Sequence, residues 1–197
     1  MNGLVPDGII GPNTKEEFEN QLSPIADRHK EIDSFKSSHD YTRWPAESTK
    51  SLTNFYGAVG TRQTRIEAPY QMFLAWDQDI KLRTIQCHEL VAESLYTVLE
   101  SIKNQYSEKE IKAFGFDQFG GAFNVRKIRG GNRWSTHSWG ISIDLDPARN
   151  GLRTKWKDSF FAKPECEAML DAFKKEGWYS LGREKGYDSM HFQACYR

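Results

Sequence analysis

The chain has 197 residues, in which 27 Lys and Arg balance 27 Asp and Glu. This length allows one domain with a full hydrophobic core and a small appendage, but not two large domains. The net charge of zero gives no overall attraction to nucleic acid, so we expect no such partner. We find no apolar run of about 18 residues and no basic, apolar leader. We therefore expect that the protein does not insert into a membrane. We also expect that it is synthesised in the cytoplasm without a signal peptide.

The first predicted element is a turn followed by a helix. Residues 7–14, DGIIGPNT, contain two turn glycines, and Thr14 with Glu17 forms a capping-box pattern for a short helix through Leu22. A plain capped helix is one interpretation. The DGxxGPxT pattern also resembles the repeat of small helical peptidoglycan-binding modules. We therefore predict a partial peptidoglycan-binding-like motif at residues 1–22.

The next segment, residues 23–60, is polar and contains Trp44-Pro45, which indicates a linker or an extended arm wrapped on the domain. Two amphipathic helices are predicted farther along, one in the segment that starts at Thr84 and one from Pro164 to Gly177. Their apolar stripes consist of Val91, Leu95, Val98 and Ile102 in the first helix, and Cys166, Met169, Leu170 and Phe173 in the second.

A short strand is predicted at residues 141–145, where apolar and polar residues alternate. Its Asp144 then faces away from the apolar side. Gly140 allows a tight turn or the close approach of another group, so the loop that carries His137 can fold back beside the strand. A histidine and an aspartate seven residues apart can therefore share one metal ion.

A second short strand is predicted at residues 190–194, with His191 and Gln193 on one face. Asp188 precedes it in a Gly-Tyr-Asp-Ser turn, so strand periodicity does not fix where its carboxylate points. Catalytic zinc commonly has three protein ligands and one water, and His137, Asp144 and His191 form such a set. Asp188 is then left as a base.

Each of these residues also has a structural interpretation. A single histidine in a polar loop is more often a hydrogen-bonding residue than a ligand, and Asp is a common turn former. The other histidines, His29, His39 and His88, have no partner at ligand spacing. Cys87, Cys166 and Cys195 show neither metal-ligand nor disulfide spacing.

The combined pattern is more specific than any single residue. Ser-x-His-x-x-Gly-x-x-x-Asp at residues 135–144, with an acidic residue three before His191, resembles the signature of a peptidoglycan peptidase family. This is the VanY-type D-alanyl-D-alanine carboxypeptidase and L-alanyl-D-glutamate endopeptidase family, which includes endolysin-like enzymes. The likeness runs from about Thr61 to the C-terminus. It departs at Gln193, where relatives often carry an acidic residue.

The resemblance implies a role for each site residue. His137, Asp144 and His191 would bind Zn²⁺, and Asp188 would be the catalytic acid and base. Arg126 would hold a substrate carboxylate or carbonyl, a task that suits the planar guanidinium. If residues 125–129 form a strand, Arg126 and Arg129 point to opposite faces, so only Arg126 should face the cleft.

These elements predict an α+β fold in which a small, mainly antiparallel sheet carries the zinc site and helices flank it. The resemblance implies a hedgehog-like or DD-peptidase-like fold. We predict a motif at residues 1–22, a linker or arm at 23–60 and a zinc metallopeptidase domain at 61–197. We also expect a monomer.

Three functions are compatible with this pattern. The first is an L-alanyl-D-glutamate endopeptidase that lyses cell walls, which the short loop from Arg129 to Ser135 favours because it leaves little material to close the site. The second is a D-alanyl-D-alanine carboxypeptidase. The third is a non-catalytic zinc-containing wall-binding module. An enzyme made without an export signal would act on the bacterial cell wall after release, as a bacteriophage lysin does.

Overall fold

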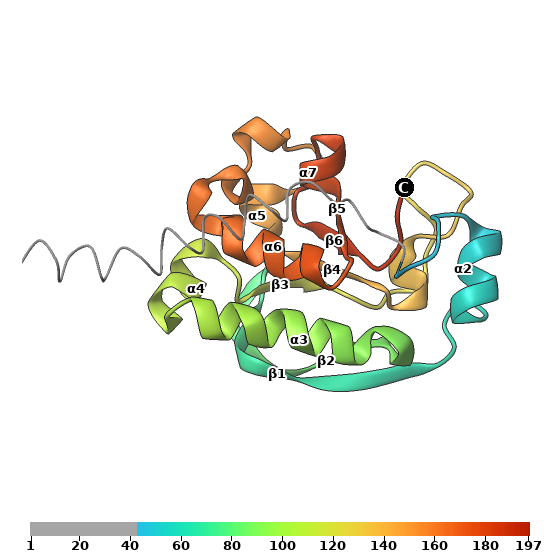
Figure 1. Ribbon diagram of the computed structural model, residues 1–197, viewed down its shortest axis with the longest axis horizontal. Coiled ribbons are helices and arrows are strands. Elements are labelled where there is room, and N and C mark those ends of the chain that lie inside the picture. Colours follow the sequence, from blue (N-terminus) through green and yellow to red (C-terminus); the bar gives the residue numbers. More distant parts are fainter. Residues whose placement is uncertain (1–42) are drawn as a thin grey trace, which may run out of the picture. The chain divides into compact units, whose positions relative to one another are not determined.

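The computed structural model describes residues 43–197 (Figure 1). The predicted motif at 1–22 and residues 23–42 of the predicted arm lie outside the described residues. The strands are β1 (Gln63–Leu74), β2 (Asp77–His88), β3 (Gln118–Gly121), β4 (Ser142–Leu145), β5 (Tyr179–Ser180) and β6 (His191–Gln193). The helices are α2 (Thr49–Tyr56), α3 (Glu89–Gln105), α4 (Glu108–Phe114), α5 (Pro147–Asn150), α6 (Glu167–Lys175) and α7 (Leu181–Lys185), with short 3₁₀ turns between them.

The strands form one six-stranded sheet in the order β2-β1-β3-β4-β6-β5. The predicted α+β class is confirmed, but the sheet is mixed rather than plainly antiparallel. Strand β3 runs parallel to β1, whereas the other neighbouring strands pair antiparallel. The chain leaves β2 through α3 and α4 before it returns as β3, and such a crossover allows parallel pairing.

The hairpin of β1 and β2 was not predicted. We expected helix from about Thr84, but β2 continues to His88 and α3 begins at Glu89. Residues 84–87 alternate in burial, since Ile85 and Cys87 are 1% exposed and Thr84 and Gln86 are half-buried. The His88 side chain then caps the helix by accepting a hydrogen bond from the backbone N–H of Leu90, 3.2 Å away. The strand-to-helix boundary is thus set by a cap.

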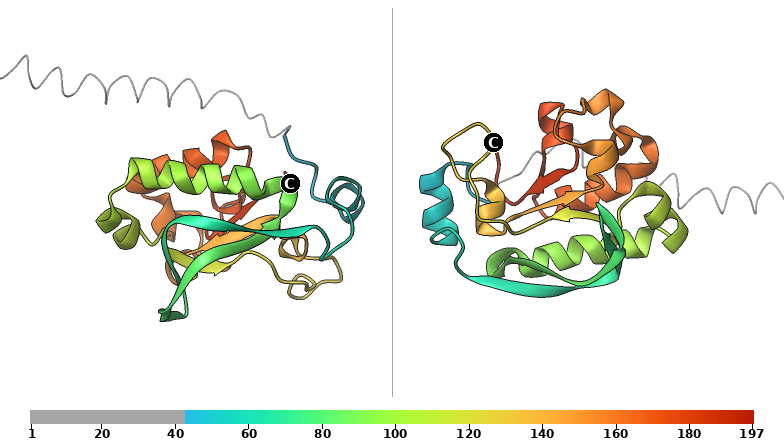
Figure 2. Two further views of the ribbon diagram at one scale, coloured as in Figure 1. Left: turned by 90° about the horizontal axis from the view of Figure 1, so that it is seen from below. Right: turned by 180° about the vertical axis from the view of Figure 1, so that it is seen from behind.

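The two predicted apolar stripes form much of the core. All eight of their residues are buried, and α3 packs against both β1 and α6, as Figure 2 shows from two sides. In α6, Phe173 stacks on Phe192 of β6, with ring centroids 3.9 Å apart and an interplanar angle of 12°. That stack fixes the strand that carries His191. No helix within residues 43–197 is long and apolar enough to cross a bilayer.

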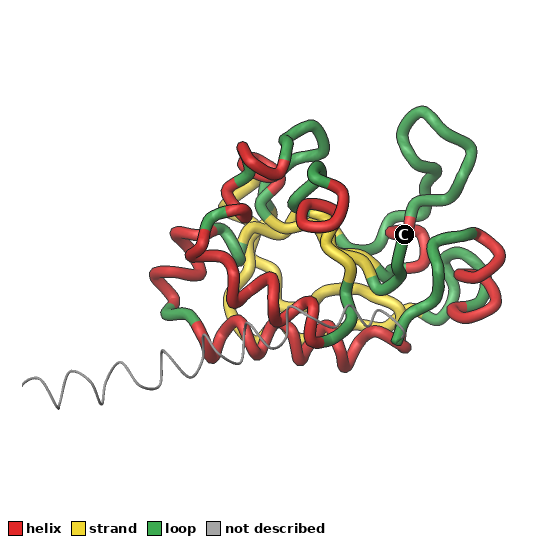
Figure 3. Tube along the Cα trace, turned by 45° about the horizontal axis from the view of Figure 1, so that its top comes forward, coloured by secondary structure: helices red, strands yellow, loops and turns green. Residues whose placement is uncertain are grey.

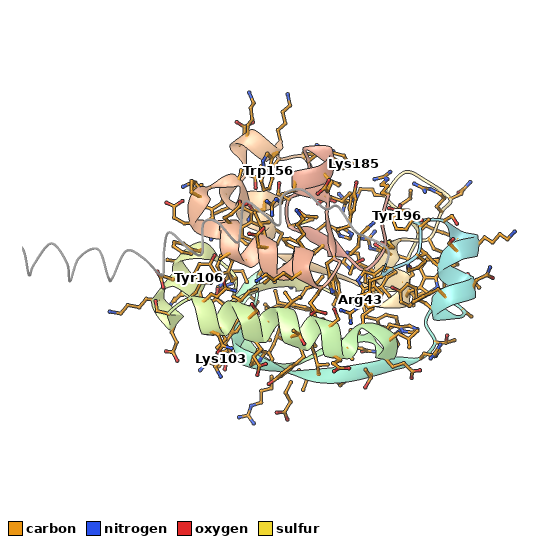
Figure 4. The ribbon with its side chains drawn as sticks, viewed as in Figure 1. Arg43, Lys103, Tyr106, Trp156, Lys185 and Tyr196 are labelled. Atoms are coloured by element: carbon orange, nitrogen blue, oxygen red, sulfur yellow. The ribbon has the colours of Figure 1, made fainter. Side chains whose placement is uncertain are left out.

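Residues 43–60 pack on the rest of this unit. Trp44, Leu52 and Tyr56 are buried in the main core, and the Tyr56 hydroxyl donates a 2.6 Å hydrogen bond to the carbonyl of Ala194. Ala46 forms a parallel bridge to Tyr196, on the same half of the domain as α2 (Figure 4). This segment therefore supports the chain directly after β6.

We predict that truncating Leu52, which is 2% exposed, destabilises the described domain. Leu52→Ala should lower the free energy of unfolding by about 2–4 kcal/mol, because it removes buried methyl groups and leaves a cavity. Urea denaturation measures the change. Lys50→Ala, on the exposed side of the same helix, is the control and should stay within about 0.5 kcal/mol of the parent. Equal effects of the two substitutions would mean that α2 does not belong to the cooperative unit.

Candidate metal centre

His137 lies in a 3₁₀ turn, η1 (Thr136–Trp139), that ends at Gly140. Gly140 has a φ of 70°, and its carbonyl accepts a 2.8 Å hydrogen bond from the backbone N–H of His88. A Cβ at this position would lie 3.0 Å from the His88 nitrogen, tighter than nine in ten real Cβ contacts. The glycine predicted to permit a close approach therefore allows the turn with His137 to sit against the end of β2.

Asp144 and His191 lie on adjacent strands. Strands β4 and β6 are antiparallel neighbours in the sheet, whose strands are yellow in Figure 3, and in their register Asp144 is directly opposite His191. Side chains of directly opposed residues project from the same face, about 5 Å apart at Cβ. The pairing of two short strands thus brings together residues 47 positions apart in the sequence.

Three side-chain atoms converge at this point. His191 Nδ1 is 2.8 Å from Asp144 Oδ1, His137 Nε2 is 3.3 Å from the same oxygen, and the two ring nitrogens are 3.2 Å apart. All three residues are at most 8% exposed. The cluster combines the three residues that the sequence predicts as metal ligands, and it is the group within residues 43–197 whose donor atoms could hold a metal ion.

Hydrogen bonds on the outer edges of both imidazole rings fix the tautomers. His137 Nδ1 donates to the carbonyl of Ala122 at 2.8 Å, and His191 Nε2 donates to Gln193 Oε1 at 3.0 Å. The amide of Gln193 has only one consistent orientation, because its nitrogen donates to Glu47 Oε2 at 3.0 Å and to the Cys195 carbonyl at 3.2 Å. In the neutral rings, both inner nitrogens therefore carry lone pairs.

This geometry fits a zinc ion. Ligands about 2.0–2.1 Å from a tetrahedral zinc lie roughly 3.3 Å apart, close to the separations of 2.8, 3.2 and 3.3 Å observed here. Two imidazoles and one carboxylate are a common donor set for catalytic zinc. Ring N–H groups held by a carbonyl and an amide oxygen are also usual around such ligands.

The charges at the cluster favour a cation. Burial would raise the pKa of Asp144, but the charges and hydrogen bonds of His137 and His191 outweigh it and hold that pKa well below its usual range. Burial would likewise lower the pKa of His191, yet the hydrogen bond and charge of Asp144, aided by Asp188, raise it. The same negative field that retains a proton on His191 attracts a metal ion.

Asp188 is a buried carboxylate in a strained turn. Its φ is 55°, in the left-handed region, and it is 7% exposed. Its Oδ1 atom has no hydrogen-bond partner among the described residues. Burial raises the pKa of Asp188, while His191, His137 and Arg126 lower it and Asp144 adds to the rise. A buried, unsatisfied acceptor beside a candidate metal centre is unusual outside functional sites.

Arg126 lies on an irregular extended segment rather than in the predicted strand. Strand β3 ends at Gly121, and Ser138 holds the backbone of Arg126 on both sides: its hydroxyl oxygen lies 3.0 Å from the Arg126 N–H and 2.7 Å from the Arg126 carbonyl. The expectation that Arg129 points away from the cleft is wrong, since both arginines line the same cavity. Without a strand, their side chains do not alternate between faces.

Two cavities meet at the cluster. The first, with a volume of about 440 Å³, is lined by the three candidate ligands, Asp188 and several arginines. The second, about 370 Å³, extends over β1, β2 and β3. Both are lined by Arg126, His137 and Asp144. The candidate metal centre therefore opens on two sides.

Comparison with known proteins supports part of the resemblance. Residues 129–194 match the model of a family described as D-alanyl-D-alanine carboxypeptidase, a range that includes Asp188 and all three candidate ligands but begins after Arg126. No curated protein and no solved structure matches the chain. The match supports a peptidase family that acts on peptidoglycan, and the cluster fits its metal requirement. The hedgehog-like fold and the VanY or endolysin subtype stay predictions.

We predict that Gln193 orients His191 toward the metal. Gln193→Leu removes the acceptor for His191 Nε2 and should weaken zinc binding about 10- to 100-fold. Competition with a chromophoric chelator measures the affinity. Gln105→Leu, at the exposed C-terminal end of α3, is a matched control that should bind zinc like the parent. If both variants kept the parental affinity, the amide would have no part in holding the ring.

Proposed function

We propose that this protein is a zinc-dependent peptidase that hydrolyses peptidoglycan stem peptides between L-Ala and D-Glu and acts in cell-wall lysis. The observation that carries the proposal is the convergence of His137 Nε2, Asp144 Oδ1 and His191 Nδ1 within hydrogen-bonding distance, with both ring protons directed outward. Three inward electron-pair donors repel one another unless a proton or a metal ion lies between them, and their separations suit a metal ion.

A zinc ion held there supplies a Lewis acid that polarises a peptide carbonyl and lowers the pKa of water. Asp188 is the general base in this proposal: it accepts a proton from the attacking water. The water oxygen bonds to the carbonyl carbon, the C–N bond breaks, and Asp188 returns the proton to the leaving amine. Burial raises the pKa of Asp188, which suits the first step, because a carboxylate with an ordinary pKa of about 3.9 is a weak base toward water.

Arg126 binds a carboxylate or carbonyl of the substrate. It is exposed, it lines both cavities, and its charge acts on Asp188, so it stands beside the proposed reaction centre. Its backbone is held by Ser138, one residue from His137. The segment that bears Arg126 is thereby tied to the turn that bears a ligand, which keeps a substrate held by the arginine near the metal.

The open arrangement favours an endopeptidase. An exopeptidase needs a pocket that closes beyond the terminal residue, whereas here cavities of about 440 and 370 Å³ meet at the centre. A chain that crosses the site can extend in both directions. The alternative, a D-alanyl-D-alanine carboxypeptidase, is favoured by the description of the matching family.

A non-catalytic wall-binding module is a weaker alternative. Such a module has no use for a carboxylate whose Oδ1 is buried and has no hydrogen-bond partner among the described residues. Leaving an acceptor buried and unpaired costs about 1–3 kcal/mol. A proton-transfer role accounts for that cost, and simple binding does not.

We predict that Asp188→Asn abolishes turnover and leaves zinc in place. Removing a general base should lower kcat about 10²- to 10⁴-fold, while the three ligands are unchanged. Steady-state assays on purified peptidoglycan and zinc content by atomic absorption give the two readouts. Asp158→Asn, at an exposed position that lines neither cavity, is the control. Survival of activity in Asp188→Asn would overturn the assignment of the base.

The products identify the cleaved bond. Digestion of peptidoglycan by the zinc-loaded protein should produce new amino termini at D-Glu, detected by mass spectrometry and suppressed by EDTA. Release of free D-Ala would establish the carboxypeptidase instead. If wall sacculi of several stem compositions gave no EDTA-sensitive product, the peptidase proposal would fail and the binding module would stand.

A further inference from the structure

The two cavities differ in the number of arginines on their walls although they share the candidate metal centre. We propose that the first cavity binds the carboxylate-bearing part of the stem peptide, which follows the cleaved bond, and that the second binds the muramoyl sugar that precedes L-Ala. This inference rests on the proposed function and adds the direction in which the substrate lies.

The first cavity is rich in arginine. Four arginines line it, namely Arg126, Arg129, Arg133 and Arg197. Apart from the candidate ligand Asp144, the carboxylates on its wall are Glu47 and Asp188. Glu47 lies 3.7 Å from both Arg133 and Arg197, which is too far for a short charged hydrogen bond. These guanidinium groups keep donors for an incoming anion.

The stem peptide carries its free carboxylates on one side of the L-Ala–D-Glu bond, the proposed site of cleavage. After L-Ala come D-Glu, with a free carboxylate, then in many walls a diamino acid with another, and the carboxy-terminus. Before L-Ala there is none, because the lactyl carboxylate of the sugar is the one that forms the amide. Arginine forks bind carboxylates in bidentate geometry. The arginine-rich cavity therefore fits the part that begins at D-Glu.

The second cavity offers an apolar and uncharged polar surface. Arg65 is its one charged residue beyond the shared Arg126, His137 and Asp144. Leu74, Leu82 and Phe119 line it, and Trp76, at the turn of the β1–β2 hairpin, is 69% exposed. The faces of an indole this exposed are available to a ligand in the cavity.

A row of polar side chains crosses the same surface. Arg65 and Gln86 are directly opposite in the hairpin, and Arg65 lies 3.4 Å from both Gln86 Oε1 and Thr84 Oγ1. Helix α3 packs against the hairpin (Figure 2). A pyranose presents apolar C–H faces with hydroxyl and acetamido groups at its edges, so an indole beside amide, guanidinium and hydroxyl groups matches it.

Continuity with the site links this surface to the reaction. The second cavity is lined by His137 and Asp144, so a sugar bound there is attached to the residue at the reaction centre. Its volume of about 370 Å³ is within the usual range of about 300–1,000 Å³ for ligand sites. A neutral sugar gains nothing from the four arginines, whereas carboxylates do. The arginines of the first cavity thus set the orientation.

Four synthetic substrates separate the two halves of the proposal. They are the muramoyl stem peptide and the sugar-free stem peptide, each with D-Glu or with its α-amide, D-isoglutamine. The ratio kcat/KM is measured for the zinc-loaded parent, and affinity is measured by calorimetry with Asp188→Asn. Trp76→Ala should lower kcat/KM for the muramoyl peptides about tenfold and leave the sugar-free peptides unchanged. Tyr96→Ala is the control, because Tyr96 is exposed on α3 and lies outside both cavities.

The arginine half has a reciprocal test. Arg129→Gln and Arg133→Gln should each lower kcat/KM for D-Glu peptides about tenfold and have little effect on the D-isoglutamine forms. Arg83→Gln, an exposed arginine of β2 outside both cavities, should leave every ratio unchanged.

The outcomes separate this inference from the proposed function. The parent could cleave these peptides while each substitution lowers kcat/KM equally with and without the sugar, and equally for D-Glu and D-isoglutamine. In that case the orientation is wrong and the peptidase stands. If Trp76→Ala alters the D-Glu preference and the arginine variants alter the sugar preference, the substrate lies in the reverse direction. If no peptide is cleaved by the parent or bound by Asp188→Asn, the proposed function itself fails.

Discussion

The site depends on the pairing of two short strands, β4 and β6. Their register places Asp144 opposite His191, and a shift of one strand by one residue would place these two side chains on opposite faces of the sheet. Strands of four and three residues provide few ladder hydrogen bonds, so the register needs support from elsewhere. The stack of Phe173 on Phe192 and the buried packing around Ile143 provide it. Core packing and candidate metal geometry are therefore one constraint.

A second constraint acts through the outer edges of the imidazole rings. In this chain a neutral amide, Gln193, holds His191, and its own nitrogen donates to Glu47. The carboxylate is thus one residue farther from the ring than in a direct carboxylate–histidine pair. Glu47 belongs to the segment before α2, whose Tyr56 also binds the carbonyl of Ala194. Residues distant in the sequence therefore converge on the strand end that presents His191.

Much of this arrangement could be predicted from the sequence, because periodicity and spacing are local. Alternation marked the strands with Asp144 and His191, and helical spacing marked the stripes of α3 and α6. The hairpin of β1 and β2 was missed, since its burial alternates only in places and is interrupted by bulges. Glu47 carries no local signal, as its role arises only through long-range packing. Arg129 was misplaced because an irregular segment has no alternating faces.

The strain and burial at Asp188 point to how these constraints serve chemistry. A left-handed turn and an unsatisfied carboxylate oxygen both cost stability, and folded proteins keep such costs mainly where function requires them. In the proposed reaction, the carboxylate must stand close to the metal without becoming a ligand. A turn separate from the strand that carries His191 allows this, because in a continued strand Asp188, three residues before His191, would point to the opposite face of the sheet. The strained turn thus keeps the proposed base beside the candidate metal centre and outside its ligand set.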